Sequence, residues 1–187
     1  MGNSYFTDPL DFLIQTLVGL YVMVIMLRVL LQWARADFYN PISQFIVKAT
    51  NPPLVPMRRL IPGFGGVDVA AIVLMLIIEM AALAFLTIIH GGVPDVLSIL
   101  VMSVAELLKL LINVFFFSII IQAILSWVNP HPYHPGVVLL QSLNEPLLRP
   151  ARRVFPPISG MDLSPLIVLI ALQVLKMLLL PPILALA

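Results

Sequence analysis

The chain has 187 residues, of which 61% are hydrophobic and 10% are charged, and its formal net charge is +1. A water-soluble core of ordinary size cannot bury this much apolar surface, so the composition predicts an integral membrane protein without a separate soluble domain. Cysteine is absent, which excludes disulfides, thiolate nucleophiles and thiolate metal sites.

Four apolar segments are predicted to cross the membrane as helices, because about 20 apolar residues span a hydrocarbon core. They occupy residues 10–31, 69–89, 110–128 and 163–180. The first segment is expected to stay in the protein, since residues 1–7 lack the Lys and Arg of a cleavable signal. Pro181 and Pro182 are expected to stop the fourth. Residues 96–108 are also apolar, and they either lengthen the third span or lie along the surface.

Basic residues gather in the stretches that follow the first and third spans, while the termini and the turn at residues 90–95 carry none. The seven are Arg35, Lys48, Arg58, Arg59, Arg149, Arg152 and Arg153. By the positive-inside rule both stretches are cytoplasmic, so both termini are predicted on the outer, periplasmic side. Trp33 and Trp127 end the first and third spans, and we expect them to be interface anchors.

The sequence contains an internal repeat. Residues 31–68 align without a gap on residues 125–162, with twelve identical positions, far more than chance gives. In the first copy these positions are Leu31, Trp33, Tyr39, Pro41, Pro52, Leu54, Pro56, Arg58, Arg59, Pro62, Gly66 and Asp68. The chain therefore divides into residues 1–93 and 94–187, which we predict to be two parallel helical hairpins in an all-α fold.

Each repeat is also predicted to contain a short amphipathic helix, over residues 41–50 and 135–144. Apolar residues recur there at helical spacing on one face. In the first copy that face holds Ile42, Phe45, Ile46 and Ala49. About ten residues are too few to cross a membrane, so both helices should lie on the cytoplasmic leaflet. Pro52 and Pro146 are expected to end them.

Twin arginines bounded by prolines come next, and we predict that each pair lies in a rigid loop, because prolines restrict the backbone. The pairs are Arg58 with Arg59 and Arg152 with Arg153. Asp68 and Asp162 stand just before the returning spans, where a carboxylate caps free helix amides.

At these residues the chain resembles the YggT family, whose repeat has a Trp, an Asn-Pro pair, a proline-bounded Arg-Arg box and a Gly-x-Asp ahead of a span. Both copies carry these features, except that Asn40-Pro41 becomes His134-Pro135 in the second. The resemblance implies a small bacterial inner-membrane protein loosely linked to osmotic or potassium homeostasis. Related plastid and cyanobacterial proteins are connected with cytochrome complex assembly and with nucleoid or division placement. No defined chemical activity is implied.

Two interpretations of the twin arginines stay open. In the first, they set the orientation of the chain and form salt bridges with Asp68 and Asp162. In the second, they also bind anionic lipid head groups or a partner, because a planar guanidinium group pairs with phosphate through two hydrogen bonds.

Glu79 lies near the middle of the second span, and Gln173 is its counterpart in the fourth. An ionisable side chain at that depth is costly and by default indicates a function. Repeats related by an axis along the membrane normal would bring these two side chains to one depth, where they can face each other across the axis. Lys176 also lies within the fourth span, and Glu79 is its nearest partner by depth. The locus then serves either as a hydrogen bond between helices or as part of an ion or proton path.

These patterns favour a non-enzymatic scaffold or assembly factor of the bacterial inner membrane that engages lipids and other membrane proteins. The alternative is a small ion-conducting or transport-modulating protein linked to osmotic stress, which would have to form a homo-oligomer because four spans enclose little space. No nucleophile triad, phosphate loop or selectivity filter is visible. His131 and His134 occupy turn and cap positions, so we expect no metal and no cofactor. The basic boxes are too short for a nucleic-acid surface.

Overall fold

The computed structural model describes residues 4–63, 66–128, 134–155 and 162–187, with side chains described for residues 7–63, 66–126, 134–155 and 162–187. Within these ranges the chain forms six α-helices and no β-strand. The helices are α1 (Ser4–Trp33), α2 (Pro41–Leu60), α3 (Val69–Ile89), α4 (Val96–Val128), α5 (Pro135–Val154) and α6 (Ser164–Leu184). Four of them, α1, α3, α4 and α6, are long and apolar enough to cross a membrane.

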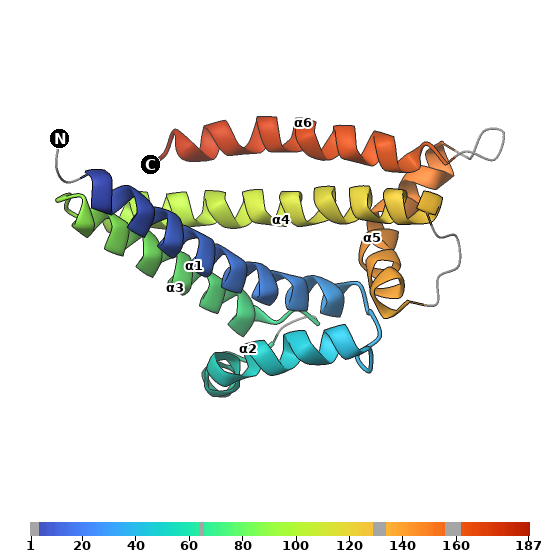
Figure 1. Ribbon diagram of the computed structural model, residues 1–187, viewed down its shortest axis with the longest axis horizontal. Coiled ribbons are helices and arrows are strands. Elements are labelled where there is room, and N and C mark those ends of the chain that lie inside the picture. Colours follow the sequence, from blue (N-terminus) through green and yellow to red (C-terminus); the bar gives the residue numbers. More distant parts are fainter. Residues whose placement is uncertain (1–3, 64–65, 129–133, 156–161) are drawn as a thin grey trace.

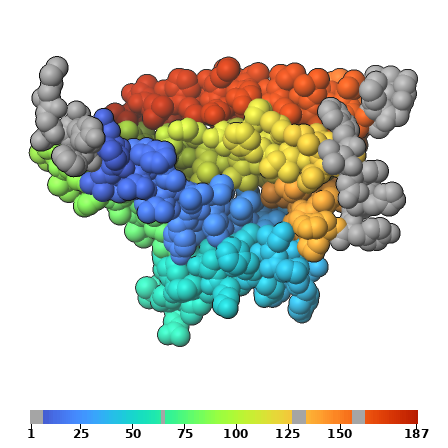
Figure 2. All heavy atoms as spheres, viewed as in Figure 1, coloured from blue at the N-terminus to red at the C-terminus, as the bar shows by residue number. Residues whose placement is uncertain are grey.

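The long helices share one bundle, and α1 begins at the same end of the bundle at which α6 ends (Figure 1). Within the first repeat α1 contacts α2 and α3, and within the second α4 contacts α5 and α6. The repeats meet where α3 packs on α4 and α2 touches α5. Figure 2 shows that α2 projects from the bundle, at a distance from the end that holds the termini.

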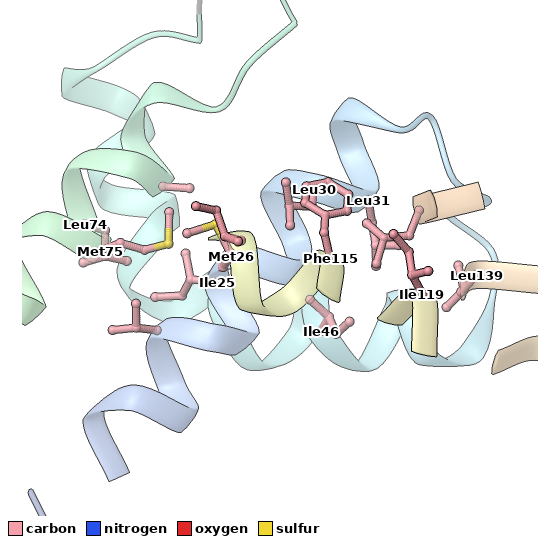
Figure 3. Close-up of a cluster of buried hydrophobic side chains, with 14 of the residues drawn as sticks. Ile25, Met26, Leu30, Leu31, Ile46, Leu74, Met75, Phe115, Ile119 and Leu139 are labelled. Atoms are coloured by element: carbon pink, nitrogen blue, oxygen red, sulfur yellow. The ribbon is translucent and has the colours of Figure 1, made fainter. Parts of the chain in front are cut away.

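An apolar core joins helices of both repeats near α2 and α5. Ile25 of α1 and Ile119 of α4 are fully buried in it. Figure 3 shows these side chains together with Met75 of α3, Ile46 of α2 and Leu139 of α5. Helices in lipid gain little from leaving an apolar solvent, so close van der Waals packing is what stabilises this part of the bundle.

Three of the predicted spans are longer in the structure. The first, predicted over residues 10–31, runs from Ser4 to Trp33 as α1. Residues 96–108 continue the third span, so α4 is one helix of 33 residues and about 50 Å, well beyond a hydrocarbon core of about 30 Å. The expected stop of the fourth span at Pro181 is wrong, because α6 continues to Leu184. Proline has a helical φ, and its missing N–H removes only bonds of the last turns there.

The short helices are also longer than the sequence predicts, and the predicted arginine loops are wrong. α2 runs through Pro52 to Leu60, and α5 runs through Pro146 to Val154. Interior prolines bend a helix without ending it where other groups satisfy the freed carbonyls. The twin arginines therefore occupy the last helical turns, where the helix dipole favours cations.

The buried face of α2 differs from the predicted apolar face. Its buried residues are Ser43, Ile46, Thr50 and Leu54. Ile42 and Phe45 are instead 40% and 67% exposed. Two of the buried residues are polar because they form hydrogen bonds, which apolar periodicity does not reveal: Ser43 donates to the Asp37 carbonyl in the turn before α2, and Thr50 accepts from Arg28 of α1.

Candidate functional site

One arginine of each pair joins the end of a short helix to the start of the next span. Arg58, in the last turn of α2, pairs with Asp68, whose side chain is only 4% exposed. Asp68 also caps α3 by accepting a hydrogen bond from the backbone nitrogen of Ala71. In the second repeat Arg152 Nε donates to Asp162 Oδ2 at 2.9 Å. The predicted salt bridges are therefore confirmed at both copies.

The second-repeat pair is more exposed and includes another carboxylate. Arg152 also pairs with Glu145 at 3.1 Å, so one guanidinium group serves two acids. Partial burial raises the pKa of Asp162, but hydrogen bonds from Arg152 and Ser164 outweigh that effect and hold this pKa below its usual value. The carboxylate therefore stays charged in moderately acidic solution.

The second arginine of each pair is free of such a role. Arg59 and Arg153 are exposed, and neither forms an ion pair with another described residue. The helices that carry them touch, since Asn40 Nδ2 at the start of α2 donates to the Pro135 carbonyl of α5 at 2.9 Å. This contact joins the starts of the two helices, whereas Arg59 and Arg153 lie in their last turns.

Arg28 attaches α2 to α1 and is 8% exposed. Its Nη1 donates to Thr50 Oγ1 at 2.5 Å, to Asn51 Oδ1 at 2.9 Å and to the Val47 carbonyl at 3.3 Å. These acceptors directly precede Pro52, where the helix lacks a backbone donor. Although Arg28 lies near the end of the first span, where a long side chain can extend toward the interface, it is enclosed between α1 and α2.

The second repeat makes the same attachment with neutral side chains. Gln122 aligns with Arg28, and Asn144 aligns with Thr50. Asn144 is fully buried, donates to Gln122 Oε1 at 2.8 Å and accepts from Ser118 Oγ at 2.6 Å. This attachment therefore does not depend on a positive charge.

A polar cavity of about 350 Å³ lies among α1, α3 and α4, and Glu79 lines it together with Gln15, Glu106, Lys109 and Asn113. Lys109 Nζ donates to both carboxylate oxygens of Glu106, at 3.0 and 2.9 Å. Glu79 itself forms no ion pair with a described residue.

The structure does not bring the predicted polar locus together. Helices α3 and α6 make no contact over their described residues, so Glu79 and Gln173 do not face each other. Lys176 also does not pair with Glu79, because its Nζ donates to Asn113 Oδ1 of α4 at 2.9 Å. The physical reason is that α4 packs on both α3 and α6. The predicted facing of the two side chains across a membrane-normal axis is therefore wrong.

Of the two predicted anchors, Trp33 is half exposed and lies edge-on to Phe115, with ring centroids 6.4 Å apart. The side chain of Trp127 lies outside the described residues. His134 caps α5 by accepting from the Gly136 nitrogen at 3.2 Å, as its position predicts, while His131 lies outside the described residues.

A family model described as CCB3/YggT matches the chain twice, over residues 7–89 and 101–183. The chain belongs to the CCB3/YggT family. The two matches agree with the internal repeat, and each contains one salt bridge between a twin arginine and the aspartate ahead of a span.

Relatives in this family share the sequence over most of its length. An uncharacterised protein of Pseudomonas aeruginosa is 46% identical, covering 89% of this chain and 86% of its own length. An uncharacterised protein of Vibrio alginolyticus is 42% identical, with 89% and 90% covered. An uncharacterised Escherichia coli protein named YggT is 39% identical, with 91% and 88% covered. No solved structure matches the chain.

Sequence reasoning missed the links that Arg28 and Gln122 make between a span and its short helix. The two positions are equivalent in the repeat, and both are polar side chains inside apolar spans, so this equivalence was the available signal. They lie just before residues 31–68 and 125–162, where the identities between the repeats are concentrated.

Proposed function

We propose that the protein is a non-enzymatic scaffold or assembly factor, located in the bacterial inner membrane, that engages anionic lipids and other membrane proteins. The observation that carries this proposal is that each short helix ends in an exposed arginine, Arg59 or Arg153, that forms no ion pair with another described residue. Each helix then acts as an amphipathic element on the cytoplasmic leaflet, attached to a helical hairpin.

Orientation and surface chemistry support the same proposal. α1 begins and α6 ends at one end of the bundle, as expected for four spans that begin and end on the outer side (Figure 1). Near the start of α2, Phe38, Tyr39 and Phe45 are 56%, 85% and 67% exposed. Aromatic side chains at that position suit the boundary between head groups and acyl chains.

The test replaces the unpaired arginines and leaves the salt bridges intact. Each basic residue near an anionic leaflet contributes about 1 kcal/mol, so Arg59→Gln with Arg153→Gln should weaken binding to anionic lipid roughly thirtyfold. Binding is measured as co-purified phospholipid and as affinity for phosphatidylglycerol nanodiscs. The matched control is Lys48→Gln with Arg149→Gln, which removes one exposed charge from each of the same helices. Unchanged lipid retention in the first variant would remove the lipid-binding part of the proposal.

A test of the scaffold part uses photocrosslinking from the exposed position of Phe45 in cells. The expected result is a small set of discrete adducts with membrane proteins, lost in the Arg59→Gln, Arg153→Gln background. A probe at Phe12, which is equally exposed at 67% on α1, should give no adduct of the same size. Identical adducts from both positions would argue against a dedicated surface.

The polar cavity favours a second candidate function, transport or its modulation. Glu79 has no ion-pair partner among the described residues, yet it lines a space of about 350 Å³ within the spans. Potassium flux into liposomes that contain the pure protein tests this function, with Glu79→Gln expected to abolish it. Glu145→Gln, which removes a carboxylate on α5 outside the cavity, is the control. Absence of potassium flux in several lipid mixtures would rule out the transport function and leave the scaffold function as the single candidate.

A further inference from the structure

A second cavity lies between the end of α1 and the start of α2, and its walls are unusually basic. It has a volume of about 360 Å³ and is lined by Arg28, Arg35 and Arg58, together with Gln32 and Ser43. Of the three arginines only Arg58 has an acidic partner among the described residues, which is Asp68. The cavity therefore carries an excess of positive charge.

Arg28 is the buried member of this set. It is 8% exposed, and every hydrogen bond that it makes to a described residue comes from Nη1 and goes to a neutral oxygen. Its Nε and Nη2 groups have no acceptor among the described residues, and neither atom is fully enclosed. They can therefore donate to an anion in the cavity, and a largely desolvated guanidinium group gains from such a partner.

Two comparisons indicate that the charge serves a ligand more than the fold. Gln122 and Asn144 form the equivalent link between α4 and α5 without any charge. Arg35 also adopts a left-handed backbone, with φ of 52°, which is uncommon for a residue other than glycine and recurs at ligand sites. The strained turn keeps a second arginine on the wall of the cavity.

The depth of the cavity indicates which anion it meets. Arg28 lies five residues before Trp33, where α1 ends, and this is about 8 Å along the helix axis. Arg35 lies two residues past Trp33, at the head-group level where lipid phosphates lie, so the cavity leads from that level down to Arg28. Guanidinium groups bind phosphate oxygens through paired hydrogen bonds.

We propose that this cavity holds the phosphate of one anionic phospholipid, with Arg28 as the buried anchor and Arg35 as the second contact. The site belongs to the first repeat alone, because Gln122 stands at the Arg28 position of the second. The inference deepens the proposed function and rests on it only in requiring anionic lipid at the leaflet beside α2.

The experiment removes the charge and keeps the helix attachment. Arg28→Gln combined with Thr50→Asn copies the Gln122–Asn144 pair into the first repeat. The full chain is delipidated in detergent, and binding of phosphatidylglycerol, phosphatidylcholine or inorganic phosphate is followed by native mass spectrometry. Loss of a charge-assisted contact should weaken phosphatidylglycerol binding at the tightest site about tenfold or more. Lys48→Gln, an exposed charge on α2 that does not line the cavity, should change it less than about twofold.

Three outcomes would overturn the inference. They are unchanged phosphatidylglycerol affinity in the double variant, equal affinity of the wild type for phosphatidylcholine, and equally tight binding of inorganic phosphate. Arg35→Gln tests the second contact independently. Arg35 is exposed in the turn after α1, so the variant should fold normally and should also bind phosphatidylglycerol more weakly.

The two proposals fail separately. If Arg59→Gln with Arg153→Gln releases lipid while the Arg28 variant does not, the helix ends bind lipid and the cavity does not. If only the Arg28 and Arg35 variants lose one lipid per chain, the cavity stands and the surface proposal fails.

Discussion

Asn144 Nδ2 donates a hydrogen bond to Gln122 Oε1 at 2.8 Å, and the aligned residues Thr50 and Arg28 are bonded at 2.5 Å in the other repeat. One connection between a span and its short helix is thus made with two different chemistries. Asn144 of α5 and Thr50 of α2 are both fully buried. Each connection therefore fixes which face of the short helix packs against its span.

Asn144→Ala should lower the free energy of unfolding by about 1–3 kcal/mol, because it removes the fully buried Asn144 amide together with its hydrogen bonds to Ser118 and Gln122. The measurement is the thermal unfolding midpoint in detergent. Ser142→Ala is the control, since the Ser142 hydroxyl bonds only to the Val138 carbonyl of its own helix. A midpoint for Asn144→Ala no lower than that of the control would contradict a structural role for the connection.

The two Arg–Asp pairs should differ in strength. Asp68→Asn removes a carboxylate that is 4% exposed, so it should destabilise the fold by about 1–3 kcal/mol. Asp162→Asn breaks a pair whose side chains are 35% and 33% exposed, so its cost should stay below about 1 kcal/mol. Chemical denaturation of both variants in one detergent measures the difference. Equal costs would mean that burial of Asp68 does not control the strength of its pair.

Acid should remove the contribution of the Asp162 carboxylate to the stability of the fold. Its pKa is lower in the folded chain than in the unfolded chain, because hydrogen bonds from Arg152 and Ser164 outweigh the effect of burial. Its stabilisation is therefore complete above the ordinary aspartate pKa of about 3.9 and is lost as the pH falls through the lower folded value. Midpoints recorded from neutral pH into acid should converge for the wild type and Asp162→Asn below that value. A gap that persists there would assign the effect to another group.

The membrane class, the spans and the repeat follow from apolar length and self-similarity, which are local properties of the sequence. The course of α2 does not, because proline penalties favour an end at Pro52. The helix continues where Arg28, distant in sequence, donates to the preceding turn. The prediction that Glu79 and Gln173 face each other is wrong for a related reason. The partners of Glu79 depend on α4 packing between α3 and α6, and spacing within one span does not encode that packing.

Membrane orientation can be tested with single cysteines, because the chain has none of its own. Val93, between α3 and α4, is 90% exposed, and Leu60, at the end of α2, is 83% exposed. With the seven clustered basic residues in the cytoplasm, a membrane-impermeant maleimide should label Val93→Cys in intact spheroplasts and Leu60→Cys only after lysis. Labelling of both cysteines before lysis would contradict the four spans, because Leu60 precedes α3 and Val93 follows it, so a membrane-spanning α3 separates them. The reverse pattern would invert the protein and move Arg28, Arg59 and Arg153 to the outer leaflet.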